Sequence, residues 1–188
     1  MWPRVTTEAS RPRLLGHLAV VAGTAALWVC LYWLNDWAFT RLEKTQAASW
    51  IFLPAALRLV AVLVWGLPAA LGLWLGAMVT SSQVFGIWSP AVLAAAPMSA
   101  LAPLLAVTIM REPLNLKPDL GGLSVAALAQ LAVASATCSA LLHSLVFVGM
   151  NDPRANPADI FVMLIGDLVG TLAVLYAFKL LLALLPRR

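Results

Sequence analysis

The stretch that decides the fold is residues 120–150, LGGLSVAALAQLAVASATCSALLHSLVFVGM, which contains no Asp, Glu, Lys or Arg. Residues 14–35 form a second stretch with the same property. About 20 consecutive apolar residues in a helix cross the core of a bilayer, so each stretch is long enough to span a membrane. We predict that both are transmembrane helices. The first exceeds the roughly 7–15 apolar residues of a signal-peptide core, so we expect it to be retained.

The composition of the whole chain supports the same class of protein. Of its 188 residues, 62% are hydrophobic and only 11% are charged, a balance that a soluble protein of this size could not bury. We therefore predict one all-α integral membrane domain over residues 1–188. Cys30 and Cys138 lie inside apolar stretches without the spacing of a metal site, so we expect no metal or other cofactor.

Polar and proline-rich breaks divide the chain into about six predicted transmembrane helices. They lie near residues 14–35, 50–66, 67–81, 90–110, 121–150 and 159–185. The break at Gly66-Leu67-Pro68 is the least certain, because Gly and Pro interrupt the apolar run there without any charge. Residues 50–81 therefore form one long tilted helix, two short helices joined tightly, or a hairpin.

The distribution of cations favours two spans in this region. With six spans and an internal N-terminus, seven cations fall inside and three outside. The internal cations are Arg4, Arg11, Arg13, Arg111, Lys117, Arg187 and Arg188, and the external ones are Arg41, Lys44 and Arg154. A single span over 50–81 would place four inside and six outside, against the positive-inside rule. We therefore predict a multi-pass protein of a bacterial inner membrane with both termini in the cytoplasm.

The net charge of +4 would suggest nucleic-acid binding in a soluble protein. Here the cations cluster at the ends of apolar segments, where they orient a membrane protein. We therefore expect the lipid bilayer, and not nucleic acid, to be the surrounding partner.

Small residues mark expected contacts between helices. Gly72 and Gly76 have the Gly-x-x-x-Gly spacing, as do Gly166 and Gly170, and this spacing lets helix backbones approach closely. The helix near 121–150 is rich in Ala, Ser and Thr, which predicts a buried central helix. Proline predicts kinks at positions 97 and 103 of the helix near 90–110.

Three ionisable residues inside the predicted spans form the candidate site: Arg58, His143 and Asp167. Each lies eight residues from the expected outer end of its helix, which at 1.5 Å per residue corresponds to a depth of ~12 Å. Charged groups inside a membrane are costly and are often functional. The matched depth predicts an Arg58–Asp167 ion pair with His143 beside it. The cluster is either a structural lock or a site for a small ligand or an ion.

The sequence contains no Ser-x-x-Lys, Gly-x-Ser-x-Gly or His-Glu-x-x-His motif and no phosphate-binding glycine loop. These motifs carry the common nucleophilic and metal-dependent hydrolytic chemistries. We therefore expect a protein that is not an enzyme, with no catalytic residues.

Two segments resemble the MASE1 family of bacterial membrane sensor domains. The first is Trp50-Ile-Phe-Leu-Pro54-Ala-Ala-Leu with the Gly-rich run from Leu71 to Ala77, and the second is Leu164-Ile-Gly-Asp-Leu-Val-Gly170. Thr108-Ile-Met-Arg111 and the polar loop after it are similar in layout. The resemblance implies a sensory module that usually precedes a cytoplasmic diguanylate cyclase or histidine kinase.

The function expected from this resemblance is signal transduction by a stand-alone, ligand-responsive module that acts through a separate membrane or cytoplasmic protein. One alternative is a small transport component, such as the substrate-binding subunit of an energy-coupling vitamin transporter, which is also a bundle of about six helices. A second alternative is a structural subunit of a larger membrane complex.

Overall fold

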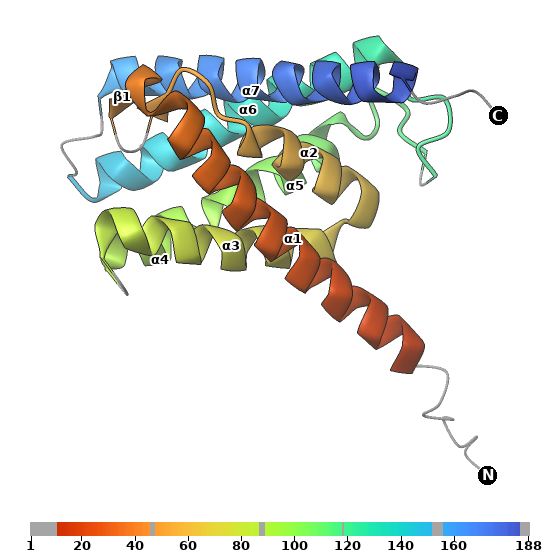
Figure 1. The fold of residues 1–188 in the computed structure, drawn as a ribbon, viewed down its shortest axis with the longest axis horizontal. Helices are drawn as coiled ribbons and strands as arrows, with labels where there is room; N and C mark the ends of the chain where they lie inside the picture. The colour runs from red at the N-terminus through yellow and green to blue at the C-terminus, as the bar shows by residue number, and fades with distance from the viewer. Residues whose placement is uncertain (1–10, 46–47, 87–88, 118, 152–155, 185–188) are drawn as a thin grey trace.

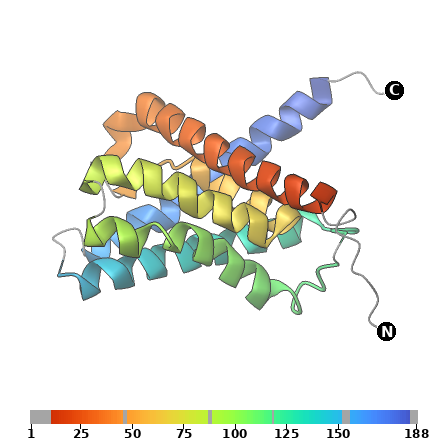
Figure 2. The same ribbon diagram turned by 90° about the horizontal axis from the view of Figure 1, so that it is seen from below.

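The computed structural model describes residues 11–45, 48–86, 89–117, 119–151 and 156–184. Its elements are α1 (Arg11–Phe39), the 3-10 turn η1 (Thr40–Leu42), β1 (Glu43–Thr45), β2 (Ala48–Ser49), α2 (Pro54–Trp65), α3 (Leu67–Phe85), α4 (Pro90–Ala95), α5 (Met98–Met110), α6 (Val125–Gly149) and α7 (Pro157–Leu184). The predicted all-α class is confirmed, apart from the short antiparallel pair β1–β2. Figures 1 and 2 show the helices packed into one bundle.

Four helical segments are long and apolar enough to cross a membrane: Leu14–Phe39, Pro90–Met110, Val125–Gly149 and Ala158–Leu181. The chain is therefore a membrane protein. Four is fewer than the six spans predicted, because the described residues between 50 and 85 supply no segment of this kind. Helix α2 has 12 residues, which at 1.5 Å per residue is ~18 Å, well short of the ~30 Å hydrocarbon core.

The chain does break at Gly66, between the end of α2 at Trp65 and the start of α3 at Leu67. Gly66 has φ of 59°, a conformation that glycine adopts without steric cost. In Figure 1, α2 runs toward the end of the bundle that holds the first turns of α1, and α3 runs back. Of the three arrangements considered for residues 50–81, the structure has two separate helices that form a hairpin.

Several predicted helix boundaries need correction. Helix α1 extends to Phe39 and α3 to Phe85, and α6 begins at Val125 and not at residue 121. Residues 50–53, predicted to open the second helix, are not helical, and α2 begins at Pro54. Proline suits this first helical position because it lacks the N–H that would have no partner there. The predicted helix 90–110 is divided into α4 and α5 at residues 96–97, where proline cannot donate a backbone hydrogen bond. Pro103, by contrast, lies inside α5 without ending it.

Close backbone contact joins α1 to α3 at Gly72 and Gly76. A Cβ on Gly72 would lie 2.5 Å from the Val21 carbonyl oxygen, and a Cβ on Gly76 would lie 2.8 Å from the Trp28 ring. Both distances are far inside van der Waals contact. The predicted role of this glycine pair in helix packing is therefore confirmed.

The ends of the helices alternate along the bundle. In Figure 1, the first turns of α1, the turn between α2 and α3, the α5–α6 connection and the last turns of α7 lie toward one end. The β1–β2 pair, the start of α4, the end of α6 and the start of α7 lie toward the other. This alternation is compatible with six crossings, made by α1, α2, α3, α4 with α5, α6 and α7 in turn. The number of crossings and the orientation stay predictions.

The orientation is tested by labelling at Asn115 and Asn151, which are both exposed and share the same backbone conformation, with φ of 49° and 50°. We expect Asn115→Cys, in a chain without other cysteines, to react with an impermeant maleimide only after the cells are permeabilised. Asn151→Cys should react in intact cells. Labelling of position 115 alone in intact cells would contradict an internal N-terminus with six spans.

The α1–α3 contact is tested by Gly72→Ala. The added methyl group would overlap backbone atoms that cannot rotate away, so we expect a loss of about 1–3 kcal/mol in stability, seen as a lower unfolding temperature in detergent. Gly23→Ala is the matched control, because a Cβ at Gly23 on α1 meets nothing within 4 Å. Equal unfolding temperatures for the two variants would show that the contact is looser than described.

Candidate functional site

A buried ion pair joins α2 to α7. The Nη2 atom of Arg58 lies 2.5 Å from Oδ2 of Asp167, and each residue is only 4% exposed. The predicted contact is therefore confirmed. Arg58 lies in the second turn of α2, after the proline that starts the helix, and Asp167 lies near the middle of α7.

Helix α6 supplies a third polar group, Ser139, which is 1% exposed. Its hydroxyl oxygen accepts a hydrogen bond of 2.7 Å from Nη1 of Arg58. Sequence reasoning did not single out this serine. The available signal was its position one helical turn before His143, which places the two residues on the same face of α6.

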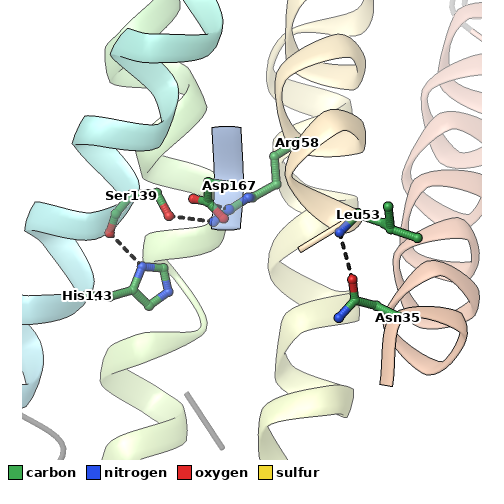
Figure 3. Close-up of polar contacts among 6 residues, drawn as sticks. All are labelled: Asn35, Leu53, Arg58, Ser139, His143 and Asp167. Carbon is green, nitrogen blue, oxygen red and sulfur yellow. Dashed lines mark hydrogen bonds and ion pairs between the residues drawn. The ribbon is translucent and has the colours of Figure 1, made fainter. Parts of the chain in front are cut away.

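His143 joins the cluster through Ser139. Its Nδ1 atom lies 2.9 Å from the Ser139 carbonyl oxygen, as Figure 3 shows. A carbonyl oxygen only accepts hydrogen bonds, so Nδ1 carries the proton in this contact. The structure thus brings all three predicted residues close together. Arg58 and Asp167 are in direct contact, and His143 is connected to Arg58 through Ser139.

Two aromatic rings complete the surroundings of Arg58. The guanidinium carbon lies 5.9 Å from the centre of the Trp28 ring and 5.4 Å from that of Phe52. The two rings meet edge to face at 6.1 Å, and Trp28 donates a hydrogen bond of 3.1 Å to Thr80 on α3. Cations are attracted to ring faces at such distances. These aromatic neighbours were not predicted.

Phe52 belongs to a non-helical segment, residues 49–53, which we call the strap. The Phe52 N–H donates to the Gly166 carbonyl oxygen at 3.0 Å, and the Leu53 N–H donates to Oδ1 of Asn35 at 2.8 Å, the latter shown in Figure 3. Asn35 is 3% exposed and was not predicted as a site residue. Helices α1 and α7 thus hold the strap from two sides.

The glycines of α7 explain how the strap comes so close. A Cβ on Gly166 would lie 1.9 Å from the Ser49 carbonyl oxygen, and one on Gly170 would lie 2.0 Å from that of Phe52. The prediction of close packing at this pair is confirmed, but the neighbour is the strap and not the backbone of another helix. Because α2 begins only at Pro54, residues 50–53 before it are not helical.

The chemistry available to the cluster is limited to charge pairing and proton exchange. Arg58 binds carboxylates, while Asp167 and His143 can each carry a proton. Among the described residues, no group of three or more His, Cys, Asp or Glu side chains could hold a metal ion. A pocket lined by residues 114–117, 120–124 and 127 lies at the α5–α6 connection and includes none of the cluster residues.

Comparison of the chain with protein-family models, with curated proteins and with solved structures finds no match. The resemblance to MASE1 sensor domains therefore stays an expectation from the sequence. The structure adds two features that do not depend on this resemblance: the buried cluster and the strap beside it.

The ion pair is tested by three variants. We expect Arg58→Leu and Asp167→Leu each to lower stability by about 3–5 kcal/mol, because each leaves the other charge buried without its partner. The double variant should recover most of the folded yield, since it removes both charges. Folded yield and unfolding temperature in mild detergent measure these effects.

Lys179→Leu serves as the control, because Lys179 is an exposed cation on α7 and its loss should change stability by less than about 0.5 kcal/mol. Single variants of the pair that are as stable as the parent would contradict the close contact between α2 and α7.

Proposed function

We propose that this chain is a non-enzymatic, ligand-responsive sensory module of a bacterial inner membrane, which acts through a separate protein partner. In this proposal it crosses the membrane six times, with both termini in the cytoplasm. The resemblance of its strap and α7 segments to MASE1 sensor domains agrees with such a role.

The observation that carries the proposal is the buried pair between Arg58 on α2 and Asp167 on α7. Helix α7 continues from the pair to Leu184, and its last turns extend beyond the rest of the bundle in Figure 2. A change at the pair would shift α7 against α2. Because a helix is rigid along its axis, the shift would reach the end of α7.

The end of α7 has side chains suited to a protein contact. Tyr176 and Phe178 are 61% and 59% exposed, and aromatic residues are enriched where helices meet partners or the membrane interface. In the proposed orientation these residues lie toward the cytoplasmic side, where an output protein would bind.

The alternative of a small transport component is favoured by one feature, the strap followed by the short helix α2. Irregular backbone next to a half-length helix is typical of substrate sites in transporters. The identity of the partner separates the two functions, because a transporter component would bind an ATPase or its coupling subunit.

The proposal is tested by purification of the tagged chain in mild detergent and identification of bound proteins. We expect a histidine kinase or a diguanylate cyclase to bind. The variant Tyr176→Ala/Phe178→Ala should reduce recovery of that partner at least about tenfold, because aromatic anchors contribute most of the energy of an interface.

Phe161→Ala is the matched control, since Phe161 is equally exposed, at 57%, but lies near the opposite end of α7. Its partner recovery should equal that of the parent. Recovery of a transporter ATPase would favour the transport alternative, and recovery of subunits of a large membrane complex would favour a structural role.

A further inference from the structure

The strap is unusual because it places non-helical backbone against the interior of a helical bundle. In a membrane protein such backbone is tolerated only where protein or enclosed water satisfies its polar groups. Here the N–H groups of residues 52 and 53 find acceptors on Gly166 and Asn35. Besides these bonds, the Ile51 N–H donates to Ser49 Oγ within the strap, and the strap carbonyl groups rest directly on Gly166 and Gly170.

The strap also covers the charged centre. The Phe52 ring lies 5.4 Å from the guanidinium carbon of Arg58, and α2 starts directly after the strap. If the strap moves away from α7, the Phe52 ring moves with it, and the Arg58 guanidinium loses one of its two aromatic neighbours. The strap thus lies between Arg58 and the end of the bundle that holds the β1–β2 pair.

We infer that Arg58 is the binding group for a small carboxylate ligand, that Asp167 occupies the position of the ligand carboxylate in this structure, and that the strap is the gate. This inference rests on the proposed ligand-responsive function and names the class of ligand. The Asp167 carboxylate shows that the place beside Arg58 accepts a carboxylate group, with Ser139 as a further hydrogen-bonding group.

Charge balance then requires a proton to bind with the ligand. Arg58 supplies one positive charge, and a second carboxylate beside Asp167 would leave one buried negative charge without a partner. The proton can be held by Asp167 or by His143, which faces the pair from α6. The contacts described for the pair from α1 and the strap are neutral, through Trp28 and Phe52, and the next acid on α7, Asp159, lies two turns earlier.

The test is calorimetric titration of the purified full chain in nanodiscs with sodium acetate and sodium benzoate, against sodium chloride at equal ionic strength. Titration in two buffers of different ionisation enthalpy counts the protons. We expect saturable binding of a carboxylate with about one proton taken up per anion. Asp167→Asn should bind it at least about tenfold more tightly and without proton uptake, because Arg58 then lacks a competing anion.

Arg58→Gln should abolish this binding. If the parent and Asp167→Asn respond to both carboxylates only as they do to chloride, the inference is overturned. Binding that persists in Arg58→Gln overturns it as well. If a kinase or cyclase partner is recovered but no carboxylate binds, only this inference fails. If a carboxylate binds but no such partner is recovered, only the signalling role fails.

The gate is tested by Gly166→Ala, whose Cβ would overlap the Ser49 carbonyl oxygen and lift the strap. We expect benzoate to bind this variant at least about fivefold faster than the parent in stopped-flow measurements. Gly149→Ala is the control, because a Cβ there meets nothing within 4 Å and should leave the rate unchanged. An unchanged rate in Gly166→Ala, with the protein folded, overturns the role of the strap as a gate.

Discussion

The arrangement of this bundle depends on the need of one buried guanidinium for a counter-ion. An arginine enclosed by apolar helices is costly unless a carboxylate and further hydrogen-bond acceptors surround it. Asp167 and Ser139 meet that need from α7 and α6. The pair therefore determines which face of α2 is turned toward α7 and α6, and the aromatic rings of Trp28 and Phe52 fill the remaining sides.

A second constraint is the close approach of backbones at four glycines. Gly72 and Gly76 admit α1 against α3, and Gly166 and Gly170 admit the strap against α7. Each contact joins a segment that precedes α2 in the sequence, α1 or the strap, to a helix that follows it, and both bring neighbours to the ion pair. The same spacing of glycines thus supports two different kinds of packing, one between helices and one between a helix and irregular backbone.

The strap connects the packing to the proposed function. A continuous helix from residue 50 would carry its own backbone hydrogen bonds and would have no reason to rest on α7. By starting at Pro54, α2 leaves a short segment that depends on Asn35 and Gly166 for its hydrogen bonds. This segment lies beside the Arg58–Asp167 pair, with the Phe52 ring 5.4 Å from the guanidinium carbon.

Several properties followed from the sequence alone. Long apolar stretches without charge predicted a helical membrane protein, and the regular rise of a helix placed Arg58, His143 and Asp167 at matched depth. These inferences hold because apolar length and helical rise are local properties of the chain. The break at Gly66 could likewise be located, although not its geometry.

Other features were decided only by tertiary structure. Ser139, Trp28, Phe52 and Asn35 became part of the site because segments distant in the sequence bring them together. Only Ser139, one helical turn before His143, had a local spacing that could have marked it. The strap was mistaken for helix because its residues are as apolar as those of α2. Its conformation is set by acceptors on α1 and α7, which exist only once those helices have packed together.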